Sequence, residues 1–190
     1  MKLRKGMGVL GMVMALSVVS AAQQQKPAPQ PPPTIASVLD KELGVVEQQV
    51  VSAAEAMPED KYGFAPTNGE FKGARTFGEQ ARHIAAANHM FFGTFFGEKA
   101  DFEVVTKGPA SVTTKAQIVQ YLKDSFAKGH KAIATITAEN AVTVLDNAPF
   151  PLVNTRLALA SFACAHSFDH YGQMVEYLRM NGIIPPASRQ

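Results

Sequence analysis

Apolar residues recur every three or four positions over four long stretches of this chain, which is the pattern of amphipathic helices. The first stretch covers residues 35–57. Thr34 precedes it as a suitable N-cap, and Pro58 is expected to end it. Its predicted inward face consists of Leu39, Leu43, Val46, Val50, Ala53 and Met57.

The second and third stretches both begin at a capping box, in which an N-cap threonine is followed three residues later by Glu or Gln. Thr76 and Glu79 open the second helix, and Gly97 is placed to end it. Thr114 and Gln117 open the third helix. Its apolar stripe is continued by a glycine at position 129, which either weakens the helix or allows a close approach by another one.

The fourth stretch is predicted to run from an N-cap at Asn154 to about Met180, where Asn181 and Gly182 provide a stop signal. The segments between the helices are rich in turn residues. Residues 102–105 are the one candidate for a short extended piece. Four long amphipathic helices without alternating strands predict an all-α protein, most simply a four-helix bundle.

Two histidines four residues apart, His166 and His170, are the main chemical feature of the fourth helix. Positions i and i+4 lie on one helical face, so both imidazoles can bind the same metal ion. His83 borders the apolar stripe of the second helix and can supply a third ligand. The alternative is that all three are hydrogen-bonded core residues, although burying three such groups without partners is costly.

The other polar candidates are assigned simpler roles. Asp169 is rotated away from both neighbouring histidines and is expected to be solvated or to pair with a basic group. Glu79 can reach an ion, but its role in the capping box already explains it. His89 and His130 are interpreted as surface residues, and the single cysteine, Cys164, as a core residue.

The N-terminal segment has the pattern of a signal peptide. A basic start is followed by an apolar run over residues 8–19 and by small residues, with cleavage expected after Ala21 or Ala22. We therefore divide the chain into a signal peptide (1–22), a Pro/Gln-rich tether (23–33) and a helical domain (34–188). This predicts export to the periplasm or medium, without a stable membrane anchor.

The charge of the mature chain is close to neutral. The full sequence has 18 Lys and Arg against 16 Asp and Glu, and three of the basic residues belong to the signal peptide, which has no acids. The mature chain keeps 15 basic residues, for a net charge of −1. No basic run remains that could follow a nucleic-acid backbone, so no nucleic-acid partner is expected.

From about Ile35 to Ser188 the chain resembles the DinB-like superfamily, also described as DinB/YfiT-like metalloenzymes. Four segments carry this resemblance, and the third is the most specific. They are YGFAPT at 62–67, RTFGEQARHIAAAN at 75–88, HSFDHYGQ at 166–173 and YLRMNGIIPP at 177–186.

The resemblance implies a bundle with an up-down-down-up order of helices. It also implies a divalent metal ion, often Ni, Zn or Fe, held by His83, His166 and His170. Some relatives are transferases or isomerases that use small thiols. Such thiols are chiefly cytoplasmic, so predicted export argues against this role here.

Together these features predict an exported metal-dependent hydrolase or transferase with an unknown substrate. The alternative is a stress-associated protein that binds a metal or small ligand without turnover. No catalytic residue and no organic cofactor site is identified. We expect a small molecule as substrate or ligand, and we leave a homodimer open.

Overall fold

Residues 31–189 are described by the computed structural model of this protein. The expected signal peptide and most of the tether lie outside the described residues. The chain from Pro33 onward forms one unit, and it contains the residues considered below.

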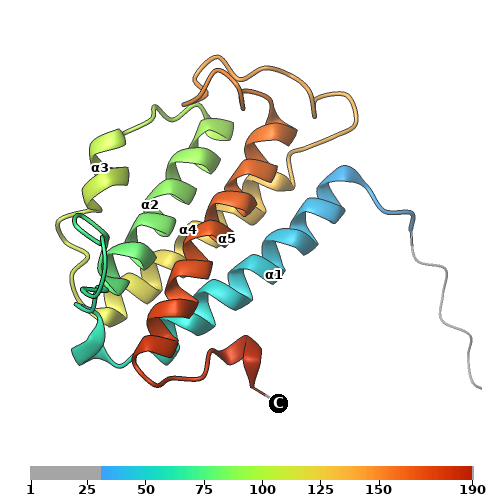
Figure 1. Ribbon diagram of the computed structural model, residues 1–190. Coiled ribbons are helices and arrows are strands. Elements are labelled where there is room, and N and C mark those ends of the chain that lie inside the picture. The colour runs from blue at the N-terminus through green and yellow to red at the C-terminus, as the bar shows by residue number, and fades with distance from the viewer. Residues whose placement is uncertain (1–30, 190) are drawn as a thin grey trace, which may run out of the picture. The chain divides into compact units, whose positions relative to one another are not determined.

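Five α-helices account for most of this unit (Figure 1). They are α1 (Ile35–Ala56), α2 (Phe77–Gly93), α3 (Phe102–Lys107), α4 (Lys115–Ile133) and α5 (Arg156–Met180). Three short 3-10 helices add single turns: η1 (Glu59–Lys61), η2 (Thr94–Phe96) and η3 (Pro186–Ser188). None of the helices in residues 31–189 is long and apolar enough to cross a membrane.

The predicted helix starts are confirmed for three of the four long helices. Thr34, Thr76 and Thr114 each accept a hydrogen bond from the backbone N–H three residues later, and a reciprocal bond closes the capping box. Gly97 ends the segment after α2 in the left-handed conformation, with φ of 78°. A glycine is favoured there because it carries no Cβ.

Two local predictions are wrong. Residues 102–105 are helical, because the Asp101 side chain accepts hydrogen bonds from the N–H groups of Glu103 and Val104 and so caps α3. Helix α5 is capped by Thr155 and not by Asn154. The Asn154 carbonyl instead accepts a hydrogen bond from Leu145 N–H at 2.7 Å, next to an isolated antiparallel bridge between Val144 and Thr155.

The four long helices form a bundle in which α1 and α2 occupy opposite corners, each packed against α4 and α5 (Figure 1). Lys115, at the start of α4, donates a hydrogen bond to the Met57 carbonyl just after α1, so these two helices are antiparallel. The C-terminal end of α5 lies beside the start of α2, where Tyr177 Oη donates to the Arg75 carbonyl at 3.1 Å. Each of these two helix pairs is therefore antiparallel, within an all-α bundle.

Close packing between helices explains the glycine in the stripe of α4. A Cβ added at Gly129 would lie 2.7 Å from Cε2 of Phe92 and 2.8 Å from Cδ2 of Leu43. Because those side chains come from α2 and α1, the glycine lets three helices meet at one point. Of the two explanations left open by the sequence, the close approach is the correct one.

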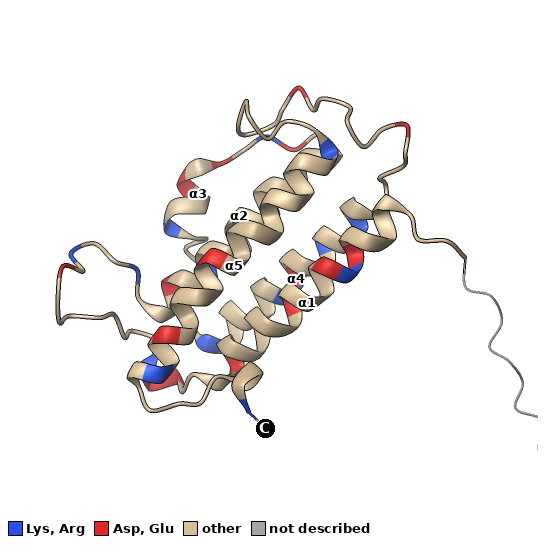
Figure 2. Ribbon diagram, turned by 45° about the vertical axis from the view of Figure 1, so that its right-hand side comes forward, with Lys and Arg blue, Asp and Glu red and all other residues tan. Residues whose placement is uncertain are grey.

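Cys164 is fully buried in the core, as predicted. Burial, with a smaller contribution from the Glu42 charge, raises the pKa of its thiol to about 12. The thiol is therefore protonated and unreactive at neutral pH. On the outside of the bundle, acidic and basic residues are interspersed along the helices and loops and are not gathered by sign (Figure 2).

Candidate metal centre

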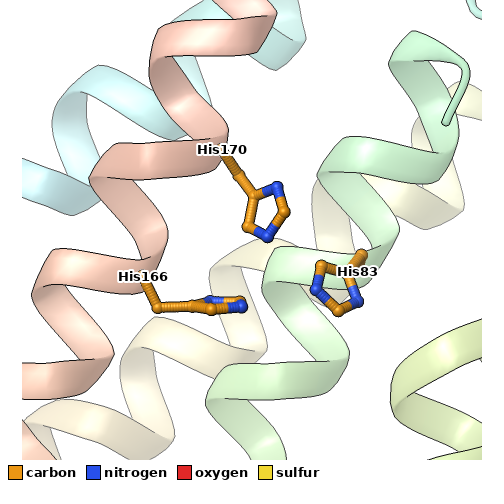
Figure 3. A group of neighbouring side chains, drawn as sticks. All are labelled: His83, His166 and His170. Atoms are coloured by element: carbon orange, nitrogen blue, oxygen red, sulfur yellow. The ribbon is translucent and has the colours of Figure 1, made fainter. Parts of the chain in front are cut away.

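The three predicted histidines converge between α2 and α5 (Figure 3). His83 comes from the second turn of α2, and His166 and His170 come from one face of α5. The ring centroids lie 4.6 to 5.2 Å apart. One nitrogen from each ring can be chosen so that all three lie within 4.8 Å of one another. This spacing suits three nitrogens around a single ion.

The orientation of His83 is fixed by α3. Its Nδ1 lies 2.7 Å from the backbone carbonyl oxygen of Val105, which can only accept a hydrogen bond. Nδ1 must therefore carry the proton, and the lone pair is left on Nε2. A backbone carbonyl in this position is a common partner for a metal-binding histidine. This contact could not be predicted from the sequence, in which residues 102–105 were a candidate for a short extended piece and not for a helix.

His170 is held by a chain of side-chain amides. Its Nδ1 lies 2.8 Å from Oε1 of Gln80, whose Nε2 donates to Oε1 of Gln173 at 2.7 Å. Nε2 of Gln173 in turn donates to Oδ2 of Asp169 at 3.3 Å. A carboxylate only accepts, so it fixes the direction of every bond in this chain. His170 therefore donates through Nδ1, and its Nε2 keeps the lone pair.

His166 has no such anchor. Its Nδ1 is buried and has no hydrogen-bond partner among residues 31–189. Instead the ring packs against Phe91, with centroids 5.4 Å apart in an edge-to-face arrangement, and against Phe162 at 6.1 Å. A buried ring nitrogen without a partner costs free energy. An ion bound through Nδ1 would offset that cost. Because the three rings also bring one nitrogen each within 4.8 Å of the others, the histidines fit a divalent metal better than they fit an ordinary core.

The three imidazoles are predominantly neutral at pH 7. Burial, reinforced by the charges of His170 and His83, lowers the pKa of His166 to about 3. Burial likewise lowers the pKa of His170 to about 4, with further repulsion from His83 and Arg75. For His83, burial outweighs the opposing hydrogen bond to Val105 and lowers its pKa. Neutral imidazoles are the form that binds metals, and nitrogen ligands suit Zn, Ni and Fe.

The two acidic candidates are not part of this cluster. The Oε2 of Glu79 accepts a hydrogen bond from Thr76 N–H at 2.8 Å, so the capping-box interpretation is confirmed. Asp169 is exposed, in agreement with the predicted solvation, and its Oδ2 also accepts a hydrogen bond from Gln173. Its contribution is indirect, through the amide chain to His170.

The structure also places the two remaining histidines away from the cluster. His89 is not a simple surface residue: its ring stacks on Tyr121 at 4.7 Å between centroids, and its Nε2 is buried. His130 is not merely solvated. Its Nδ1 lies 2.6 Å from Oδ1 of Asp40 and its Nε2 lies 3.1 Å from Oε2 of Glu47, so it joins α4 to α1. Neither carboxylate could be paired with it from sequence, because they lie 90 and 83 residues earlier in the chain.

A cavity of about 510 Å³ borders the histidine cluster at His83. It lies between the start of α2, the preceding loop and the end of α3. Its lining residues are Gly73, Ala74, Arg75, Glu79, Arg82, His83, Thr106, Lys107 and Gly108. A volume of this size can hold a small molecule.

Comparisons with known proteins agree with this architecture. A crystal structure of a DinB-like protein from Bacillus cereus ATCC 10987 is 16% identical, covers 78% of this chain and 93% of that chain, and gives a TM-score of 0.62. A protein assigned to the DinB family, from Exiguobacterium sibiricum 255-15, is 17% identical, covers 78% and 92%, and gives a TM-score of 0.56. At these identities the likeness shows the fold alone.

A search of curated proteins found no match to the chain. The sequence model of the DinB superfamily, by contrast, matches residues 42–174, which is more than half of the chain and includes all three histidines. The protein therefore belongs to the DinB superfamily.

Proposed function

We propose that His83, His166 and His170 bind one divalent metal ion, with Zn, Ni and Fe as the candidates. The observation that carries this proposal is the convergence of three ligand atoms within 4.8 Å, in a site where no other use for them is found among residues 31–189. The hydrogen bonds from Nδ1 of His83 and His170 support it further, since they leave Nε2 of both rings free to bind.

The proposed activity is that of a metal-dependent hydrolase or transferase with a small-molecule substrate. When bound, a divalent metal supplies a lowered pKa for a water or thiol ligand and polarises a carbonyl group. Three protein nitrogens leave further coordination positions open, as in catalytic and not structural zinc sites. The cavity beside His83 offers room for a substrate next to those positions.

The chain's own residues have separate parts in this proposal. Phe91 and Phe162 pack around His166 and limit water on that side of the cluster. Gln80 and Val105 hold two rings in the ligating tautomer. Glu79 is the single carboxylate among the residues that line the cavity, which makes it the candidate for a proton-transfer group, although its capping bond competes for this role.

The alternative is a protein that binds a metal or small ligand without turnover. The two functions differ in the state of the metal. A catalytic ion keeps an exchangeable position, whereas storage or structural ions are commonly enclosed by four protein ligands. The cavity at His83 favours the catalytic function.

Metal analysis and spectroscopy of the chain without residues 1–22 would test both functions. We expect about one metal ion per chain, as the geometry of a single cluster requires. In the cobalt-loaded protein, added azide or 2-mercaptoethanol should shift the visible absorption bands, because a ligand enters an open position. Bands that do not change would support storage, and absence of stoichiometric metal would contradict the site itself.

Export remains part of the proposal. It rests on the basic, apolar and small-residue pattern of residues 1–22, which lies outside the described residues. Expression of the full chain in a bacterial host should give a shortened protein in the periplasmic or medium fraction. N-terminal sequencing should begin at Ala22 or Gln23. An intact N-terminus on protein from the cytoplasm would contradict export.

A further inference from the structure

The cavity beside the histidine cluster has an excess of positive charge. Arg75, Arg82 and Lys107 line it, against one acid, Glu79. The Glu79 carboxylate already accepts a hydrogen bond from the backbone at Thr76. A small organic molecule that enters this cavity therefore meets more cationic than anionic groups, next to His83.

Two of the three cations are engaged by the protein. Arg82 donates from Nη1 to the Val112 carbonyl at 3.1 Å. Its side chain passes so close to Gly108 that a Cβ there would overlap Cδ and Nε of the arginine, and Gly108 has φ of +73°. Lys107 pairs with Glu103 at 3.0 Å in an exposed i, i+4 ion pair. Arg82 is thus part of a fixed wall, and Lys107 is a solvated residue at the rim.

Arg75 differs from both of them. Its backbone is anchored, because Tyr177 Oη donates to its carbonyl. The residue as a whole is half-buried, and no ion pair or hydrogen bond to its guanidinium is found within residues 31–189. Five N–H donors on a half-buried planar cation normally find acceptors. Arg75 lines a cavity that is also lined by the candidate metal ligand His83, and its donors are therefore available to an anion that enters there.

Arg75 and His83 line the same cavity of about 510 Å³. A ligand held in this cavity can therefore contact Arg75 and the edge of the histidine cluster at His83.

We propose that this cavity binds the oxyanion group of a substrate, a carboxylate or a phosphate, through the guanidinium of Arg75. Arginine suits this role because its planar fork can donate two parallel hydrogen bonds to either group. Arg82 and Lys107 add positive potential, and the remainder of the substrate extends toward His83. The last statement rests on the proposed metal centre, whereas oxyanion binding by Arg75 does not.

Isothermal titration calorimetry of the mature chain tests this proposal with three probes. Succinate and inorganic phosphate represent the two oxyanions, and succinamide is the neutral counterpart of succinate. Each is titrated into metal-free and zinc-loaded protein. We expect an oxyanion to bind in both states, with affinity that falls as salt is added, and succinamide not to bind. The tighter of succinate and phosphate indicates which group the natural substrate carries.

The variant Arg75→Gln should weaken oxyanion binding by about tenfold or more, because hydrogen bonds to a charged group are lost. The oxyanion affinity of Arg75→Lys should lie between that of Arg75→Gln and that of the wild type, because lysine keeps the charge but lacks the planar guanidinium. Lys131→Gln removes an exposed charge that does not line the cavity and serves as the matched control. Circular dichroism should show equal helicity in all variants.

Three results would overturn the proposal: wild-type affinity in Arg75→Gln, equal binding of succinamide and succinate, or no binding of either oxyanion at millimolar concentration. Oxyanion binding that needs zinc and ignores Arg75 would place the anion on the metal, so this inference fails while the metal site stands. Arg75-dependent oxyanion binding in a protein that takes up no metal would support this inference and contradict the proposed metal site.

Discussion

The cluster of three histidines and the single histidine His130 have opposite electrostatic surroundings in this bundle. His83, His166 and His170 meet between α2 and α5 with no carboxylate among the grouped ligand atoms, and burial lowers the pKa of each. His130, on α4, lies between Asp40 and Glu47 of α1. Burial alone would lower its pKa, but hydrogen bonds to these two acids outweigh it and raise the pKa.

The comparison teaches that the neighbours of a histidine, and not the histidine itself, decide its role. With acids at both ring nitrogens, His130 has a raised pKa and joins two helices through its hydrogen bonds to Asp40 and Glu47. Without acids, the three clustered rings stay neutral and keep lone pairs available. A neutral cluster does not repel an approaching metal cation, whereas a protonated cluster would repel it.

The largest expected effect comes from removing a ring of the neutral cluster. His166→Ala should lower metal affinity by about 100-fold or more, because two nitrogens remain where three are needed. Competition with a chromogenic chelator would measure it. His130→Gln is the matched control and should keep wild-type affinity. Similar losses of metal affinity in both variants would mean that the clustered histidines and His130 do not differ in function.

A smaller effect is expected from the residues that orient the rings. Gln80→Leu removes the acceptor for Nδ1 of His170 and should lower metal affinity by about 10 to 100-fold. Gln120→Leu, on the exposed side of α4, is the control for this change of side chain. Unchanged affinity in Gln80→Leu, measured by the same chelator competition, would show that the amide chain does not support the site.

The smallest effect concerns stability and has opposite signs in the two groups. Because the folded-state pKa of His130 is raised, its contribution is present below about pH 6.5 and is lost as pH rises through the raised value. His166 has a lowered folded-state pKa, so the metal-free protein loses stability as pH falls from about 6.5 toward about 3.

Urea unfolding of metal-free protein at several pH values would measure these slopes. His130→Gln should lose up to about 1 kcal/mol relative to wild type at low pH and less at high pH. His166→Ala should show a flatter loss of stability on acidification than wild type does. Parallel pH profiles for wild type and both variants would contradict the electrostatic difference between the groups.

Most of the bundle could be predicted because its helices are specified by local signals. Apolar stripes, capping boxes at Thr76 and Thr114, and the stop at Gly97 each depend on residues within one or two turns. The i, i+4 spacing of His166 and His170 is local in the same sense. The error at residues 102–105 overlooked a local signal, the cap at Asp101, whereas at Asn154 the backbone is engaged by another segment through Leu145.

The sequence by itself therefore determined the helices and the three histidines that share inward faces. Only the tertiary structure decided their partners: Val105 and Gln80 for two of the rings, and Asp40 and Glu47 for His130. It also placed Arg75 at the cavity, with no ion pair to its guanidinium within residues 31–189. The physical reason is distance along the chain. A helical period fixes which face a residue occupies, but hydrogen bonds and charges between helices depend on how those faces are brought together.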